Sequence, residues 1–415
     1  HQKVIEEAPS SFVDERTRKK MYAQAVALAK KVGYYSAGTV ECLMDKEKNF
    51  YFMEMNTRLQ VEHSVTEYIT GLDLVELMIK VAMGEKLPIK QTDIKLTGWA
   101  LECRINAEDP TRGFLPSSGR ISKYIEPETN SNIRVDTSVY EGYTISMFYD
   151  SMIAKLITYG KDRNEAIQTM REALGSFYID GISHNMSFLE AIMYNERFKK
   201  GDISTNFIKE EFSKGFSGVS IENNNEGVLI GTAIYMFVMN ANRLLNISGQ
   251  VLRTKHELAD KWVADLNGSK YLCNVAKTSK GISVEYGSGF SLVETNWEFG
   301  DSIFRGEVNG RPINIKVIKD NKTGNFKLQF MGSVTDITIR SPRISELEKH
   351  MPIIDVNKKV TKLKAPITGK IVKFLAKEGD EVKAGSELLI IEAMKRENII
   401  RADQDVIIKK INFQN

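Results

Sequence analysis

The sequence predicts an α+β protein with several domains, the last of which is a small all-β module. The chain has 415 residues, of which 42% are hydrophobic, and this length is enough for two or three domains. Near the C-terminus, short apolar runs are separated by glycine-bearing turns, as in residues 365–372 and 379–385, a pattern typical of short strands. In the middle of the chain, one long apolar run precedes many strand-like segments, which predicts a barrel wrapped on a helix.

Composition excludes some functions. With 57 basic and 54 acidic residues, the net charge is +3, which is too balanced to indicate nucleic-acid binding. Three cysteines, at positions 42, 103 and 273, lack metal-ligand or CxxC spacing. Their odd number argues against a disulfide framework and is consistent with a reducing compartment. The apolar run at residues 227–239 is short for a bilayer and predicts a buried helix. The chain begins at His1, inside a motif and without a signal peptide, so we expect a fragment.

Two acidic side chains are expected to face each other near the N-terminus. Residues 38–45 and 50–56 form strand-like runs around a charged turn, which predicts a hairpin. A symmetric register places Glu41 opposite Glu54, about 5 Å apart, where like charges are destabilising unless neutralised. Mg²⁺ would neutralise them, since it takes carboxylate oxygens together with substrate phosphates. The alternative is a solvated acidic pair beside a lysine.

Polar residues then occupy every second position: Glu54, Asn56, Arg58, Gln60 and Glu62. In an extended chain, this alternation puts all five side chains on one face. An ordinary amphipathic strand would show the same period. The inventory nevertheless favours chemistry, because carboxylates suit a metal, and an amide and a guanidinium suit an oxyanion.

Residues 391–395 (IEAMK) place Lys395 at the predicted tip of a β-hairpin. A long, flexible lysine stem on a tight turn can carry a ring cofactor clear of its domain. The alternative is an ordinary solvated turn lysine.

Several motifs resemble those of biotin-dependent carboxylases. Residues 391–395 are similar to the biotinyl domain, in which the Lys of Ala-Met-Lys is joined to biotin; lipoyl domains share the fold but typically read Asp-Lys-Ala. Residues 54–63 (EMNTRLQVEH) resemble the signature of biotin carboxylase, an ATP-grasp enzyme, and residues 1–9 resemble its preceding motif. Residues 102–110 (ECRINAEDP) match a further motif, and residues 149–157 match a segment that we assign to packing and dimer contacts.

The resemblance implies roles for the matching residues. Glu41 and Glu54 would hold Mg²⁺ (or Mn²⁺) between the phosphates of ATP, with Asn56 supporting this site. Glu62 would be the general base that deprotonates bicarbonate for attack on the γ-phosphate, giving carboxyphosphate.

The substrate-binding residues follow from the same resemblance. Arg58, Gln60 and the backbone of Val61 would hold bicarbonate. Arg104 would stabilise the enolate-like oxygen of the biotin ureido group, although a lone strand arginine is more often a surface residue. The remaining implied ligands are His1 and Lys3 near ATP and Lys395 as the biotin attachment site.

This chain departs from the family pattern at three positions. Ser64 replaces a proline, which removes a φ restraint after the proposed base and is expected to loosen it. Arg396 stands where a second methionine is usual. Val406 replaces a glycine, and the closing turn and last strand of the biotinyl fold are expected to be missing.

The resemblance predicts four segments, closest to those of propionyl-CoA carboxylase α subunits. Residues 1–212 would be the C-terminal part of the ATP-grasp biotin carboxylase, and residues 213–342 a linking domain with a β-barrel on a helix. Residues 343–362 would be a tether with a short helix, and residues 363–415 a truncated biotinyl domain.

The chain is too short to include a carboxyltransferase, so we expect a separate carboxyltransferase β subunit in a hetero-oligomer. A biotin–protein ligase would attach biotin. The expected compartment is the bacterial cytoplasm or the mitochondrial matrix. The substrate alternatives are acetyl-CoA and methylcrotonoyl-CoA, and the alternative from another class is a non-catalytic biotin carrier and assembly subunit.

Overall fold

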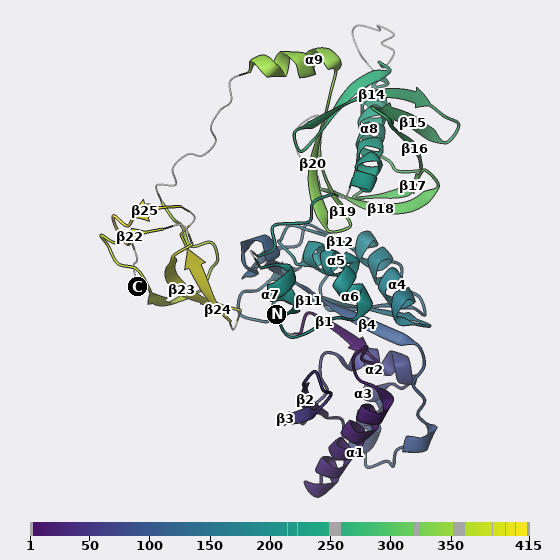
Figure 1. Cartoon of the computed structure of the whole chain (residues 1–415), viewed down its shortest axis with the longest axis vertical. Coiled ribbons are helices and arrows are strands. Elements are labelled where there is room, and N and C mark those ends of the chain that lie inside the picture. Colours follow the sequence, from purple (N-terminus) through teal and green to yellow (C-terminus); the bar gives the residue numbers. More distant parts are fainter. Residues whose placement is uncertain are drawn as a thin grey trace.

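The computed structural model shows an N-terminal body, a central sheet with its helices, a β-barrel and a small C-terminal β-unit (Figure 1). It describes the following residues: 3–213, 215–221, 223–248, 259–318, 324–351, 362–383, 385–394, 396–402 and 404–412.

The N-terminal body combines helices with one hairpin. Two of its helices begin at acidic caps. The Asp14 side chain accepts a hydrogen bond from the backbone N–H of Thr17, and Asp73 caps a later helix in the same way through the N–H of Glu76. These caps satisfy N–H groups that lack a partner within the helix. The elements are β1 (Ile5–Ala8), α1 (Glu15–Lys31), β2 (Thr39–Met44), β3 (Phe50–Asn56), α2 (His63–Thr70), α3 (Leu74–Ala82) and η1 (Gln91–Asp93).

A four-stranded antiparallel sheet, in the order β1–β4–β11–β9, forms the centre of the molecule. The sheet brings the motif at residues 1–9 beside the motif at residues 102–110, because Glu6 of β1 lies opposite Glu102 of β4. The other strands and the two helices packed near them are β4 (Trp99–Asn106), β9 (Ile133–Thr137), β11 (Met152–Gly160), α4 (Arg163–Ser176) and α5 (Met186–Tyr194).

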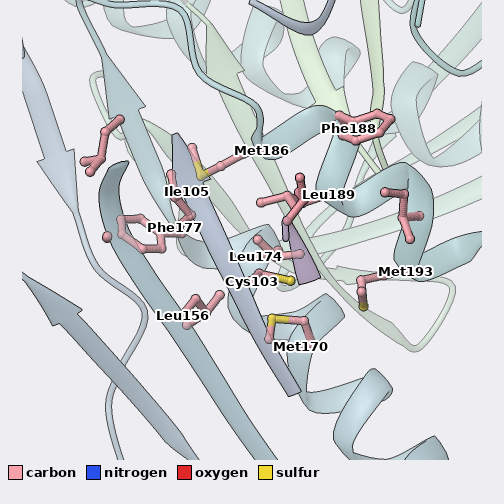
Figure 2. Close-up of a cluster of buried hydrophobic side chains, with 14 of the residues drawn as sticks. Cys103, Ile105, Leu156, Met170, Leu174, Phe177, Met186, Phe188, Leu189 and Met193 are labelled. Atoms are coloured by element: carbon pink, nitrogen blue, oxygen red, sulfur yellow. The ribbon is translucent and has the colours of Figure 1, made fainter. Parts of the chain in front are cut away.

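Side chains of β4 alternate between an apolar core and a polar face. Cys103 and Ile105 are fully buried among residues of β11, α4 and α5, including Leu156, Met170 and Leu189 (Figure 2). Period-two alternation therefore turns the polar residues between them to the opposite side of the strand. The remaining elements of this region are β5 (Glu108–Asp109), η2 (Pro110–Arg112), β6 (Leu115–Pro116), β7 (Gly119–Arg120), β8 (Lys123–Ile125), β10 (Thr144–Ile145), β12 (Tyr178–Asp180), α6 (Glu196–Lys200) and α7 (Phe207–Glu211).

The predicted barrel on a helix is confirmed. Eight antiparallel strands in sequence order close into a barrel, and helix α8 (Asn223–Leu245) runs along its interior (Figure 1). The strands are β13 (Lys261–Leu266), β14 (Ser269–Lys277), β15 (Gly281–Tyr286), β16 (Gly289–Thr295), β17 (Ile303–Val308), β18 (Arg311–Ile318), β19 (Asn325–Phe330) and β20 (Ser333–Arg340).

Glycines allow α8 to approach the strands closely. A Cβ at Gly227 would lie 1.8 Å from the Tyr286 hydroxyl, and a Cβ at Gly231 would lie 2.9 Å from Val293. Among the described residues, this is the one helix long and apolar enough to cross a membrane, over Asn225–Leu245. The helix is therefore longer than the apolar run expected at residues 227–239. Its assignment as a buried helix is confirmed, since its apolar side chains pack inside the barrel.

A buried ion pair joins the barrel to the sheet domain. Lys316 of β18 donates to the carboxylate of Glu190 on α5, at 2.5 Å, and both side chains are almost fully buried. The same carboxylate accepts hydrogen bonds from Gln329, at 3.2 Å, and from the backbone N–H of Gly332, at 2.8 Å. A buried charge requires such compensation, so this cluster fixes the contact between the two units.

The tether begins with the predicted short helix, α9 (Pro342–Leu347), followed by η3 (Glu348–His350). Beyond it lies an all-β unit with a small core that includes Ala376, Leu388 and Ala402. Its three-stranded sheet has the order β21–β23–β24, and β22 pairs with β25. The strands are β21 (Lys370–Phe374), β22 (Glu381–Val382), β23 (Glu387–Ala393), β24 (Arg396–Arg401) and β25 (Val406–Ile407).

Candidate active site

The predicted carboxylate pair is present. Glu41 of β2 lies directly opposite Glu54 of β3, in the hairpin expected from the sequence. Asn56 joins them through its side-chain amide, which donates to Glu41 at 3.1 Å and to Glu54 at 3.0 Å. The hairpin thus presents two carboxylates and an amide oxygen from neighbouring positions.

Glu41 also gathers donors from outside the hairpin. Lys3 Nζ lies 2.7 Å from its Oε1, and the Gln60 amide donates to the same oxygen at 2.5 Å. The hydrogen bond from Lys3 is the main cause that lowers the pKa of Glu41, and the same bond raises the pKa of Lys3. Glu41 therefore stays anionic, as a ligand for a hard cation must.

Glu62 links this cluster to the central sheet. Its Oε1 lies 3.4 Å from Lys3 Nζ, and its Oε2 accepts from Arg104 Nη2 at 2.8 Å. The same guanidinium nitrogen lies 2.8 Å from Glu6 on β1. Burial raises the pKa of Glu6 to about 7, although Arg104 opposes the shift. One arginine thus contacts two carboxylates of different environments.

Lys155 braces the backbone beside the proposed base, and this role was missed in the sequence. It is nearly fully buried on β11, and its Nζ donates to the Val61 carbonyl at 2.9 Å and to Ser64 Oγ at 2.8 Å. The signal was available: a lysine stands in the middle of an otherwise apolar strand. The assignment of residues 149–157 to packing was therefore incomplete.

Hydrogen bonds hold Ser64, which stands where the resembling family has a proline. Its side chain is fully buried, accepts from Lys155, and donates to Asp136 at 3.3 Å. The hydrogen bonds thus replace the φ restraint that a proline would supply.

Glu102 is a second missed residue. It is fully buried, both of its carboxylate oxygens lack a hydrogen-bond partner within the described part of the chain, and Lys155 Nζ lies 3.9 Å away. Burial raises the pKa of Glu102 to about 8, so the proton is retained at neutral pH. Its place opposite Glu6 is the signal that could have indicated a carboxylate cluster.

The structure therefore brings together seven predicted site residues. The alternation of side chains along an extended strand accounts for the positions of only some of them. Strand β3 ends at Asn56, so the expected alternation does not continue as a strand. Arg58 is exposed and its side chain donates to the Leu59 carbonyl at 3.1 Å, while its charge helps to lower the pKa of Glu41. His1 and Lys395 lie outside the described residues. The gathered residues are Lys3, Glu41, Glu54, Asn56, Gln60, Glu62 and Arg104.

The hairpin fits a magnesium ion that shares its coordination with a substrate. Among the described residues, no group of three or more His, Cys, Asp or Glu side chains could hold a metal. Mg²⁺ is commonly bound by one or two carboxylates plus substrate phosphates. Glu41 and Glu54 supply that number, and Asn56 can supply an amide oxygen.

Four family models match the chain in succession. They are the ATP-binding domain of the carbamoyl-phosphate synthase L chain (residues 1–90), the biotin carboxylase C-terminal domain (102–210), the propionyl-coenzyme A carboxylase BT domain (229–353) and the biotin-requiring enzyme domain (361–415). Together they cover both ends of the chain and the barrel.

Curated relatives match along nearly the whole chain. The propionyl-CoA carboxylase alpha chain of Ruegeria pomeroyi is 45% identical over 99% of this chain and 63% of its own length. The human mitochondrial propionyl-CoA carboxylase alpha chain is 41% identical over 100% of this chain and 57% of its own. Mouse mitochondrial methylcrotonoyl-CoA carboxylase subunit alpha is 35% identical over 100% of this chain and 58% of its own length. The chain thus spans roughly three-fifths of the length of these relatives.

A solved structure agrees with this relationship. The complete multifunctional pyruvate carboxylase from Rhizobium etli is 35% identical, with a TM-score of 0.51, over 57% of this chain and 23% of that one. The four domain matches and the full-length similarity to alpha chains lead to one conclusion. The chain is homologous along nearly its whole length to the alpha chains of propionyl-CoA carboxylases, and its successive segments match biotin carboxylase and biotin-requiring domains.

Proposed function

We propose that this chain is part of an enzyme that uses ATP to carboxylate carrier-bound biotin with bicarbonate, by way of carboxyphosphate. The observation that carries the proposal is the contact of Glu62 with Arg104 and Lys3, at 2.8 and 3.4 Å. A base beside two fixed cations suits an anionic substrate that must lose a proton before it attacks a phosphate.

Each part of the cluster has a task in this proposal. Glu62 accepts the bicarbonate proton, and Arg58, Gln60 and the Val61 backbone orient the bicarbonate. Lys3 and His1 contact the nucleotide. Glu41, Glu54 and Asn56 would hold Mg²⁺, which neutralises phosphate charge during transfer.

Biotin would be carried at Lys395 and would react beside Arg104. A fixed guanidinium stabilises negative charge that develops on the ureido oxygen when biotin loses its N1 proton. The C-terminal β-unit matches the biotin-requiring domain over residues 361–415, and a biotin–protein ligase would attach the cofactor there.

We favour propionyl-CoA as the final carboxyl acceptor. The relatives support this choice, because propionyl-CoA carboxylase alpha chains reach 45% identity and the methylcrotonoyl-CoA carboxylase subunit reaches 35%. Transfer of the carboxyl group from biotin to the acyl-CoA would take place on a carboxyltransferase β subunit in a hetero-oligomer. Bacterial and mitochondrial relatives favour the cytoplasm or the mitochondrial matrix.

We also propose the division of the chain at residues 212, 342 and 362. It separates the carboxylase part, the barrel, the tether and the carrier. The family matches at 1–90, 102–210, 229–353 and 361–415 support this order, and the third of them extends past residue 342.

The direct test is bicarbonate-dependent ATP cleavage by the full-length protein. Glu62→Gln should lower the rate roughly 10²- to 10⁴-fold, as expected for the loss of a general base. Glu47→Gln, which changes an exposed carboxylate in the β2–β3 turn, serves as the matched control and should leave the rate unchanged.

Labelling with biotin separates this proposal from a purely carrier role. Streptavidin blotting after co-expression with ligase should label the wild type and not Lys395→Ala. A protein that is labelled but shows no bicarbonate-dependent ATP cleavage would be a carrier and assembly subunit. Equal labelling of both variants would refute Lys395 as the attachment site.

A further inference from the structure

The tip of the β23–β24 hairpin packs against the sheet domain (Figure 1). Met394 is 4% exposed and belongs to the same buried cluster as Ile105 and Ile153. Its backbone N–H donates to the Met147 carbonyl at 2.9 Å. The residue directly before Lys395 is therefore held by both apolar packing and a main-chain hydrogen bond.

An ion pair crosses the same contact. Arg396 Nη1 lies 2.7 Å from Glu108 Oε1, and the side chains are 46% and 2% exposed, respectively. Ser151 Oγ donates to the same carboxylate oxygen. A carboxylate this deeply buried is costly without a partner, and here its cationic partner comes from the C-terminal unit.

The contact lies just beyond the strand that carries the proposed biotin-binding arginine. Arg104 is on β4, which ends at Asn106, and Glu108 opens β5 four positions after Arg104. Four residues of extended chain span about 13 Å. The docked hairpin therefore brings the residues on both sides of Lys395 near the end of β4, one short segment from Arg104.

We propose that Arg396 and Glu108 form a docking latch that positions the carrier hairpin for carboxylation, an inference that rests on the proposed function. Arg396 acts as a positioning residue, because it touches neither substrate nor reacting atoms. Charge pairs across an interface select one orientation and suppress others. A methionine, usual at this position in the resembling family, could not make this contact.

The latch must also release, because the carrier has to reach a carboxyltransferase. Nearly half of the Arg396 side chain remains exposed, and water and salt can compete for a guanidinium in that position. The docked state should therefore weaken as ionic strength rises.

The first test does not depend on activity. In the full-length biotinylated protein, hydrogen exchange of the Met394 amide reports docking, because that N–H is bonded to Met147. Arg396→Met and Glu108→Gln should each accelerate exchange by about tenfold, an effect between those of exposed and buried charge pairs. Arg396→Lys should recover part of the protection, because it keeps the charge.

The second test compares two acceptors. Carboxylation of the attached biotin, normalised to biotin content, should fall about tenfold in Arg396→Met, whereas carboxylation of free biotin should not change. Raising the salt concentration should slow the wild type toward the rate of Arg396→Met and leave the variant little affected.

Arg401→Met is the matched control. Arg401 lies on the same strand and pairs within its own unit, with Glu387 at 2.6 Å, so its loss should alter neither Met394 exchange nor carrier carboxylation. Unchanged Met394 exchange in both Arg396→Met and Glu108→Gln would overturn the latch. Absence of ATP cleavage in the wild type would instead refute the proposed function, and the exchange result would still decide the latch.

Discussion

Lys155 Nζ donates a hydrogen bond to the carbonyl oxygen of Val61, across 94 positions of the sequence. The bond ties the segment that precedes α2 to the centre of the sheet. Since Val61 is followed directly by Glu62, a side chain from the middle of β11 fixes the main chain at the proposed bicarbonate site.

Ser64→Ala should weaken this brace without removing it. Loss of one buried hydrogen bond costs about 1 kcal/mol, so we expect the KM for bicarbonate to rise several-fold while the KM for ATP stays constant. Steady-state kinetics of both substrates will check this. Ser131→Ala, at an exposed serine, is the control, and an unchanged bicarbonate KM in Ser64→Ala would contradict the brace.

Burial of Glu102 should make stability depend on pH. Its pKa is about 8 in the folded protein and near 4.5 when unfolded, so above pH 4.5 the folded state binds more protons. The stability that Glu102 contributes is therefore fully present below pH 4.5. It is lost as the pH rises to about 8, which lowers the free energy of unfolding by a few kcal/mol.

Glu102→Gln should flatten this dependence, because an amide does not titrate. Unfolding by urea, followed between pH 5 and 8, measures the slope. Variant and wild type should differ least at low pH and most near pH 8. Parallel slopes in the two proteins would exclude Glu102 as the titrating group.

The Lys316–Glu190 pair should be far more sensitive to single than to double substitution. Lys316→Met leaves a buried carboxylate without its cation, and we expect a loss of roughly 3 to 5 kcal/mol. Adding Glu190→Leu should recover part of this loss, because the uncompensated buried charge is removed, but the Gln329 amide and the Gly332 N–H then lose their acceptor.

Differential scanning calorimetry can compare these variants. Lys199→Met serves as the control, since Lys199 pairs with Glu196 at the surface. Its loss should lower the free energy of unfolding by less than about 1 kcal/mol. If Lys316→Met also melts like the wild type, the pair does not stabilise the contact between barrel and sheet domain.

Gly227→Ala should destabilise the barrel by about 1 to 3 kcal/mol, the usual cost of overpacking. The added methyl would collide with the Tyr286 hydroxyl, 1.8 Å away. Tyr286→Phe removes that oxygen and should relieve part of the loss in the double variant. Thermal unfolding monitored by circular dichroism will show whether the two substitutions compensate.

Local patterns were sufficient to predict much of the fold. The hairpin that pairs Glu41 with Glu54 follows from two strand-like runs around a charged turn, and the barrel follows from short strands after one apolar helix. Both depend on neighbours in sequence, for which period and turn residues are informative.

The site could be predicted only in part, because its remaining members come from distant segments. Lys155 lies opposite Arg104 through the pairing of β4 with β11, and it meets Val61 because the segment before α2 lies against that sheet. No local period encodes these contacts. The hydrogen bonds of Ser64 could not be predicted for the same reason: its partners, Lys155 and Asp136, lie on strands far along the chain. Arg396 likewise finds Glu108 only after two units have docked.

The order of α8 before its barrel has a consequence for synthesis. The helix leaves the ribosome before any strand that covers it, and the barrel closes only when β20, ending at Arg340, pairs with β13. Until then, a segment with the length and apolarity of a membrane span is uncovered. Such surfaces promote aggregation of incomplete chains, so the nascent protein should require chaperone protection until its last barrel strand has emerged.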